Sequence, residues 1–106
     1  MGEETKTTGF SKIGIIGLGL IGGSLAKAIH TRTDIKEIVA VDKDEASLKM
    51  AEEEGVIAGS SKEDLSILSG CDVVILCAPV DVIKNMQDDL SKLDIGMITD
   101  VKARKL

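Results

Sequence analysis

The sequence has few residues of the kinds that form disulfides, metal centres or catalytic bases. Its 106 residues include two cysteines and one histidine. Cys71 and Cys77 border an apolar run without C-x-x-C spacing, which is typical of reduced, buried thiols rather than of a disulfide or a metal pair. His30 falls at the end of a predicted helix, where we expect a surface group near the negative helix terminus. The sequence therefore predicts no catalytic residue and no metal site in this chain.

Positive charge is also scarce, and it is not gathered into a stripe. Thirteen Lys and Arg residues stand against 18 Asp and Glu residues, which gives a formal net charge of −5. Neither a phosphate backbone nor an acidic lipid attracts such a surface, so we expect no nucleic-acid and no membrane partner. Residues 1–11 contain no apolar stretch, which predicts a flexible leader, neither a secretory signal nor a membrane span, and a cytoplasmic location.

The most informative pattern is a group of closely spaced glycines in residues 13–25. A G-x-G-x-x-G turn directly follows an apolar strand pattern and directly precedes a helical one. In this context Gly17 permits a tight turn, Gly19 lets the backbone approach a pyrophosphate, and Gly22 lets the helix pack closely on the strand. The positive helix start favours an anion. Ser24 either adds a hydroxyl donor there or only satisfies the backbone of the first turn.

An acidic residue at the end of the next strand supports a dinucleotide site. The apolar run 38–41 ends in Asp42, 20 residues after Gly22, where a carboxylate can accept hydrogen bonds from the adenosine ribose. Asp42 could instead be a helix-capping acid before Asp44. Lys43 could hold the 2′-phosphate of NADP, yet the neighbouring carboxylate would repel that phosphate. The pair therefore predicts NAD in preference to NADP.

Apolar runs of strand length alternate with amphipathic segments of helix length, which predicts an α/β fold with a parallel sheet. Strands are expected at residues 12–17, 37–42, 56–57, 72–77 and 96–101. The first helix should end near residue 30 and bury Ile21, Leu25, Ala28 and Ile29. The second runs through Ala46, Met50 and Ala51 to Gly55, a capping box at 61–64 starts a brief third, and a fourth opens at Pro79 with Ile83, Met86 and Leu90 inward.

These elements predict a Rossmann-type doubly wound sheet in the order 3-2-1-4-5, with the nucleotide across the carboxyl ends of the strands. The sequence stops before a sixth strand, so the fifth would be an edge with unpaired N–H and C=O groups. We expect this edge to be covered by self-association into a homo-oligomer.

The chain resembles the amino-terminal domain of prephenate dehydrogenase, the NAD-dependent enzyme of tyrosine biosynthesis. The resemblance rests on residues 13–25, 72–80 and 99–101, and it spans about residues 12–101. It implies a dehydrogenase that oxidises and decarboxylates prephenate to 4-hydroxyphenylpyruvate with hydride transfer to NAD. It also implies that the loop 77–80 runs beside the ribose and nicotinamide of the cofactor.

The resemblance also shows what this chain lacks. In the family, a histidine beyond the fifth strand takes the hydroxyl proton, and a helical carboxy-terminal domain holds the substrate. The family's Gly-Ser-x-Lys segment is altered, because Lys102 replaces the glycine, Ala103 replaces the serine, and Lys105 falls at the lysine position. We therefore expect a cofactor-binding fragment that is inactive alone. A free-standing NAD-binding module, or the cofactor domain of an arogenate, hydroxyacid or imine dehydrogenase, remains an alternative.

The predicted organisation is a leader at 1–11, an NAD-binding domain at 12–101 and an atypical tail at 102–106. The predicted cofactor-binding residues come from the glycine turn, the second strand end and the loop after the fourth strand: Gly17, Gly19, Leu20, Ile21, Gly22, Ser24, Asp42, Lys43, Cys77, Ala78 and Pro79.

Overall fold

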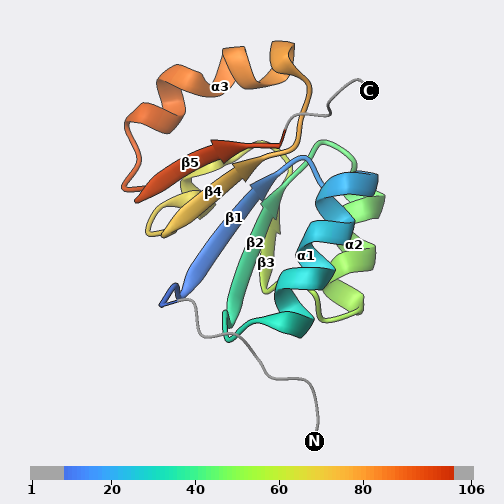
Figure 1. The fold of residues 1–106 in the computed structure, drawn as a ribbon. Helices are drawn as coiled ribbons and strands as arrows, with labels where there is room; N and C mark the ends of the chain where they lie inside the picture. The colour runs from blue at the N-terminus through green and yellow to red at the C-terminus, as the bar shows by residue number, and fades with distance from the viewer. Residues whose placement is uncertain (1–8, 102–106) are drawn as a thin grey trace, which may run out of the picture.

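The computed structural model describes residues 9–101, which form one five-stranded parallel sheet (Figure 1). The strands are β1 (Lys12–Ile16), β2 (Glu37–Val41), β3 (Gly59–Ser61), β4 (Val73–Leu76) and β5 (Met97–Asp100). Their order is β3-β2-β1-β4-β5, and every pairing is parallel. The predicted doubly wound fold and its strand order are confirmed.

Helices cover both faces of the sheet. Helices α1 (Leu20–Arg32) and α2 (Glu45–Glu53) lie together on one face, and α3 (Val80–Ser91) lies on the other (Figure 1). A short 3₁₀ helix, η1 (Leu65–Leu68), connects β3 to β4 and packs on the same side as α3. Among the described residues, no helix is long and apolar enough to cross a membrane.

The core consists of two apolar clusters separated by the sheet. Ile13 and Ile15 of β1 join the cluster beneath α1 and α2, whereas Ile16 joins the cluster beneath η1 and α3. In β4, Val73 belongs to the first cluster and Val74 to the second. Successive side chains of a strand point to opposite faces, so the unbroken apolar runs of these central strands are explained by burial on both sides.

The strand registers bring three loops together at one edge of the sheet. Ile16 at the end of β1 pairs with Val41 at the end of β2 and with Leu76 at the end of β4. The segments that follow these three residues therefore begin at the same level. This carboxyl edge is where doubly wound sheets bind ligands, at the point where strand order reverses between β1 and β4.

The third strand was predicted at the wrong residues. Val56 and Ile57 are buried in the core cluster beneath α2, and β3 begins two residues later at Gly59. Ala58 N–H donates to the carbonyl oxygen of Ile38 at 2.7 Å and leads into the pairing with β2. An edge strand needs little apolar character of its own, so the polar sequence of β3 gave no signal. The other four strands lie where predicted, with ends that differ by at most one residue.

The buried face of α1 also differs from the prediction. Ile21 is 54% exposed and Ala28 is exposed, whereas Ala26 is fully buried and Ile29 packs against the core. The face toward the sheet is thus formed by Gly22, Ala26 and Ile29, at a spacing of four and three residues. The first two of these residues are small, and at Gly22 the helix lies almost in contact with the end of β1. The helix continues to Arg32, two residues past the predicted end.

Helix α2 buries Leu48, not Met50. Leu48 is 5% exposed and Met50 is 61% exposed, while Ala51 is half-buried against the core. The helix ends before Gly55, which has a φ of +75° as expected for the residue past a helix end. In α3 the predicted inward residues are confirmed, because Ile83, Met86 and Leu90 all pack in the second cluster.

The remaining predictions concern the two cysteines and the histidine, which the structure describes, and the two ends of the chain, which it does not. Cys71 is buried and Cys77 half-buried, both are free thiols, and burial raises the pKa of each, that of Cys71 to about 11. His30 is exposed in the last turn of α1, as expected. The predictions for residues 1–8 of the leader and for the tail at 102–106 concern positions outside the described residues.

Candidate functional site

The turn after β1 is fastened to both neighbouring strands. Gly17 N–H donates to the carbonyl oxygen of Val41 at 2.9 Å, and Cys77 N–H donates to that of Ile16 at 2.8 Å. These bonds continue the pairing of β1 with β2 and β4 past the strand ends. They place the glycine turn, the segment after β2 and the segment after β4 side by side.

Two glycines of the turn have no room for a side chain. Gly17 has a φ of +90°, and a Cβ there would lie 2.9 Å from the backbone nitrogen of Ala78. A Cβ on Gly22 would collide with the carbonyl oxygen of Gly17. The tight turn and the close helix packing predicted from the motif are thus present, and they bring the start of α1 directly over the end of β1.

Gly19 differs from these two glycines because it faces open space. A Cβ built on it meets no atom within 4 Å, and Gly19 is the N-cap residue of α1 without a side-chain cap. The first N–H groups of a helix have no partner within the helix and carry the positive end of its dipole. The open backbone at Gly19 therefore gives an anion direct access to the start of α1, at Leu20 and Ile21.

The carboxylate of Asp42 is fixed beside this helix start. Its Oδ2 accepts a hydrogen bond from Leu18 N–H at 2.6 Å, and its Oδ1 accepts one from Asp44 N–H at 2.9 Å. Each carboxylate oxygen has a further lone pair, so Asp42 retains the capacity to accept two more hydrogen bonds. Such a pair of acceptors matches the two hydroxyl groups of a ribose.

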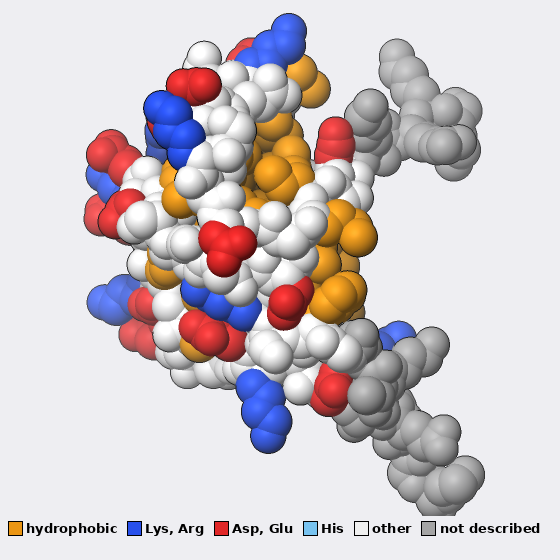
Figure 2. All heavy atoms as spheres, turned by 90° about the vertical axis from the view of Figure 1, so that its left-hand side faces the viewer, with side chains coloured by type: hydrophobic (Ala, Val, Ile, Leu, Met, Phe, Trp, Pro, Cys, Tyr) orange, Lys and Arg blue, Asp and Glu red, His pale blue; other side chains and the backbone are white. Residues whose placement is uncertain are grey.

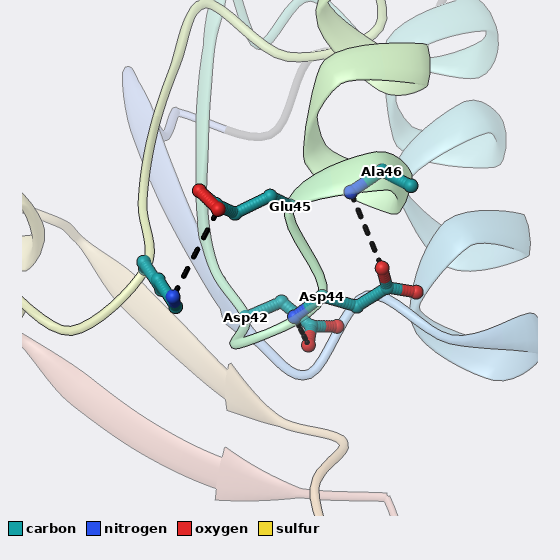
Figure 3. Close-up of polar contacts among 5 residues, drawn as sticks. Asp42, Asp44, Glu45 and Ala46 are labelled. Carbon is teal, nitrogen blue, oxygen red and sulfur yellow. Dashed lines mark hydrogen bonds and ion pairs between the residues drawn. The ribbon is translucent and has the colours of Figure 1, made fainter.

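The capping role considered for Asp42 belongs to Asp44. Asp44 is the N-cap residue of α2, and its side chain accepts a hydrogen bond from Ala46 N–H at 3.2 Å (Figure 3). It also accepts one from the hydroxyl of Ser47 at 2.7 Å. The Ser47 bond and the backbone N–H groups lower the pKa of Asp44. Asp42 is thus free of the capping role, and it points toward the glycine turn instead.

A cavity of about 280 Å³ opens at this edge of the sheet. It is lined by the strand ends, the loops that follow them and one face of α3: Ile16, Gly17, Gly19, Val41, Asp42, Lys43, Lys62, Cys77, Ala78, Pro79, Val82 and Met86. Seven of the predicted residues, Gly17, Gly19, Asp42, Lys43, Cys77, Ala78 and Pro79, are thereby brought together around one space.

Three residues that line the cavity and lie outside the strands were not predicted as site residues. Lys62 directly follows β3, so the rule that ligands bind at the carboxyl ends of strands would have found it, had β3 been placed correctly. Val82 and Met86 lie four residues apart on α3 and form an apolar side of the cavity. The sequence assigned Met86 only to the core. For Val82, the only sign of a shared face was its position four residues before Met86.

Three other predicted residues, Ile21, Gly22 and Ser24, lie outside this cavity. Gly22 is buried beneath the turn, and Ile21 is exposed at the start of α1. Ser24 is exposed and lines a different groove of about 440 Å³ between α1 and α2. That groove is larger and shares Gly19 with the cavity, but neither Asp42 nor the loop after β4 lines it. The cavity at the strand ends is therefore the candidate site. For Leu20 the structure describes only the backbone.

Comparison with known proteins identifies the family of this chain and several similar dehydrogenases. A family model described as NADP oxidoreductase coenzyme F420-dependent matches residues 12–103. The prephenate dehydrogenase of Lactococcus lactis subsp. cremoris is 33% identical over 97 residues, covering 89% of this chain and 27% of that protein. The prephenate dehydrogenase of Bacillus subtilis is 33% identical over 94 residues, covering 86% of this chain and 25% of that protein.

A solved structure gives the same result for the fold. The crystal structure of prephenate dehydrogenase from A. aeolicus in complex with hydroxyphenyl propionate and NAD+ superposes with a TM-score of 0.75 at 26% identity. The match covers 85% of this chain and 32% of that one. The similarity to prephenate dehydrogenases predicted from the sequence motifs is confirmed, and the chain spans about a quarter to a third of the length of these relatives.

Proposed function

This chain belongs to the NADP oxidoreductase coenzyme F420-dependent family, and from that premise we propose that it is the NAD-binding domain of a dehydrogenase that acts on prephenate. We assign the domain to residues 12–101. The observation that carries the proposal is the Asp42 carboxylate, held by two backbone N–H groups beside the open start of α1, in the wall of one cavity. The likeness to prephenate dehydrogenases supports the choice of substrate.

The proposed binding mode assigns one part of the cofactor to each part of the cavity. The pyrophosphate lies at Gly19 and accepts hydrogen bonds from the first-turn N–H groups of Leu20 and Ile21. The ribose hydroxyls of adenosine donate to the remaining lone pairs of Asp42. The adenine ring packs against the apolar side formed by Val82 and Met86.

The loop after β4 is assigned to the other half of the cofactor. This loop lines the cavity next to Gly17 with Cys77, Ala78 and Pro79. It follows β4, which lies on the opposite side of β1 from β2, the strand that precedes Asp42. Burial raises the pKa of the Cys77 thiol, so the side chain is neutral at neutral pH and acts there as a small apolar surface. The bound nicotinamide supplies the hydride acceptor for oxidation of the prephenate ring hydroxyl.

We further propose that the 106-residue chain binds the nucleotide without oxidising prephenate. Its single histidine, His30, lies ten residues after the first residue of α1. At 1.5 Å per residue this is about 15 Å along the helix away from the proposed pyrophosphate position. The histidine is therefore out of reach of the reacting groups, and we assign no catalytic residue to this chain.

Calorimetric titration of the 106-residue chain with NAD+ and NADP+ tests the proposal. We expect weak binding of NAD+ and binding of NADP+ that is about tenfold weaker, a difference of about 1.4 kcal/mol, because the 2′-phosphate meets the Asp42 carboxylate. Gly19→Ala is the matched variant. Its added methyl group enters open space, so the fold should be retained while the approach of the pyrophosphate is blocked. A wild-type chain that binds neither nucleotide, or a Gly19→Ala variant that binds as well as wild type, contradicts the proposal.

We also propose that the chain self-associates through the edge of the sheet at β5. All four residues of β5 are exposed, and its one pairing among the described residues is with β4. Figure 2, which views the molecule from the side of β5 and α3, shows apolar side chains reaching the surface; the exposed ones include Met97, at 56%, and Ile98, at 44%. Unpaired strand edges pair readily with other strands.

Light scattering over a range of concentrations measures this association. We expect the wild-type mass to rise toward a multiple of the chain mass, and the Ile98→Lys variant to stay monomeric because a charged side chain at an edge disfavours pairing. A wild-type chain that remains strictly monomeric at high concentration excludes the proposal.

A further inference from the structure

A lysine and a glutamate near the ribose end of the cavity form an ion pair that the proposed binding mode does not use. Lys62 follows β3 and lines the cavity together with Asp42 and Lys43. Its Nζ lies 3.8 Å from Oε1 of Glu45, the first residue of α2 (Figure 3). Glu45 itself is not among the lining residues. It therefore affects the cavity through the lysine.

The balance of charge at this end of the cavity is set by residues from two loops and from the start of α2. Asp42 and Lys43 follow β2, Lys62 follows β3, and Glu45 begins α2. Of these two carboxylates and two ammonium groups, Glu45 and Lys62 form an ion pair. The 2′-phosphate of NADP adds nearly two negative charges at the position where NAD carries a hydroxyl. Whether a lysine is available to that phosphate or is held by a carboxylate then decides how well NADP is accepted.

We propose that Glu45 is a specificity-determining residue, which selects NAD over NADP by holding Lys62 in an ion pair. The inference rests on the proposed function, because it concerns the same cavity and cofactor. Asp42 repels the 2′-phosphate directly, and Glu45 acts indirectly by withdrawing the cation that would bind it. Lys62 is the group that a 2′-phosphate would contact once Glu45 is neutral.

The size of the effect follows from the exposure of the pair. The two side chains are 53% and 70% exposed, so water and salt screen their interaction. Releasing Lys62 should therefore improve NADP+ binding by about three- to tenfold, within the range of charge-assisted contacts at a protein surface. NAD+ has no charge at this position, so its affinity should change less than twofold.

The test is calorimetric titration of four proteins with both nucleotides: wild type, Glu45→Gln, Lys62→Gln and the double variant. Glu45→Gln should raise NADP+ affinity about three- to tenfold and leave NAD+ affinity unchanged. The double variant should lose this gain, because the gain depends on the lysine. Repeating the titrations at high salt should reduce the gain. Glu53→Gln is the matched control, since it makes the same change of net charge at the exposed far end of α2.

The possible failures are distinguishable. If the wild-type chain binds neither nucleotide, the proposed function is wrong and this inference falls with it. If NAD+ binds but Glu45→Gln leaves the ratio of the two affinities unchanged, the proposed function stands and the role of Glu45 is overturned. A gain that Glu53→Gln reproduces, or that persists in the double variant, also overturns it, because it would come from net charge alone or from another group.

Discussion

The two ends of the sheet are each fastened by an aspartate, but the candidate cavity lies at the carboxyl end, beside Asp42. At the carboxyl end, Asp42 accepts two backbone N–H bonds. At the amino end, Asp72 does the same, with Ser11 N–H at 2.7 Å and Lys12 N–H at 3.1 Å. At both ends, therefore, an aspartate carboxylate that accepts backbone hydrogen bonds joins segments that are distant in the sequence. The difference lies in what surrounds each carboxylate.

At the amino end, polar groups of neighbouring loops form hydrogen bonds with one another. Lys12 donates from Nζ to the carbonyl oxygen of Ser69 at 2.8 Å, and Gly70 N–H donates to that of Asp94 at 2.7 Å. At the carboxyl end, by contrast, a cavity of about 280 Å³ remains beside the aspartate, and Asp42 lines it. The comparison teaches that an aspartate bound to backbone amides is structural by default, and that open space beside it is what points to a ligand.

The largest expected effect comes from replacing each aspartate in turn. Asp42→Ser should weaken NAD+ binding about 10- to 100-fold, because hydrogen bonds to a charged group are lost, and it should relax the preference for NAD+ over NADP+. Asp72→Ser should leave both affinities unchanged while lowering the thermal midpoint. Calorimetric titration and thermal unfolding measure the two outcomes. Unchanged discrimination in Asp42→Ser, or a loss of affinity in Asp72→Ser, would break the comparison.

A smaller effect concerns the two thiols, which lie on either side of β4. Cys77 follows the strand and lines the cavity, whereas Cys71 precedes it and is buried, with its pKa raised to about 11. We expect NAD+ at ten times its Kd to slow the reaction of Cys77 with a thiol reagent about tenfold, since bound cofactor covers it. Cys71 should react slowly with or without NAD+.

The variants Cys71→Ala and Cys77→Ala assign the two rates in this experiment, because each leaves one thiol to be followed. If NAD+ protects the thiol of the Cys77→Ala variant and not that of Cys71→Ala, the assignment of the carboxyl end as the binding end is wrong.

The smallest expected effect is on stability in acid. It concerns Asp72, the aspartate at the amino end of the sheet. The N–H groups of Ser11 and Lys12 lower the pKa of Asp72 from its ordinary 3.8. A lowered pKa in the folded state stabilises the fold above the ordinary value, and this stabilisation is lost as the pH falls through the lowered pKa. Asp44 and Asp64 have lowered pKa values too, so part of the acid dependence remains in any single variant.

Urea unfolding midpoints measured from about pH 5 down to about pH 2 should therefore fall less in Asp72→Asn than in wild type. Asp88→Asn is the control, because that carboxylate is exposed on α3 and pairs there with Lys92, whose side chain is also exposed. Its loss should leave the wild-type slope intact. Parallel slopes for wild type and Asp72→Asn would show that the bonds of Asp72 do not contribute to acid stability.

The sequence predicted the sheet and the centre of the site because both depend on strong local patterns. Glycine spacing identified Gly17 and Gly22, whose side-chain space is occupied by backbone atoms, and the end of an apolar strand identified Asp42. The unbroken apolar runs of β1 and β4 reflect burial on both faces. Such patterns are imposed by the backbone itself, so they can be recognised without knowing the rest of the structure.

What the sequence did not predict depends on contacts between distant elements. The polar strand β3 is defined only by its pairing with β2, and Lys62 was missed with it. The inward face of α1 is set by how closely that helix approaches β1, which favours Ala26 over the larger Ile21. Val82 joins the site only because α3 packs next to the loops. None of these features can be recognised from one segment of the sequence without the segment it packs against.

The hydrogen bond from Leu18 N–H to Asp42 has a consequence for the thermodynamics of ligand capture. The Asp42 side chain loses its rotational freedom when the protein folds, and not when a ribose binds. A receptor that is organised in advance loses less entropy on association, so a larger share of the contact energy is expressed as affinity. In the proposed binding mode, the acceptor oxygens of Asp42 are therefore in position before the ribose hydroxyls arrive.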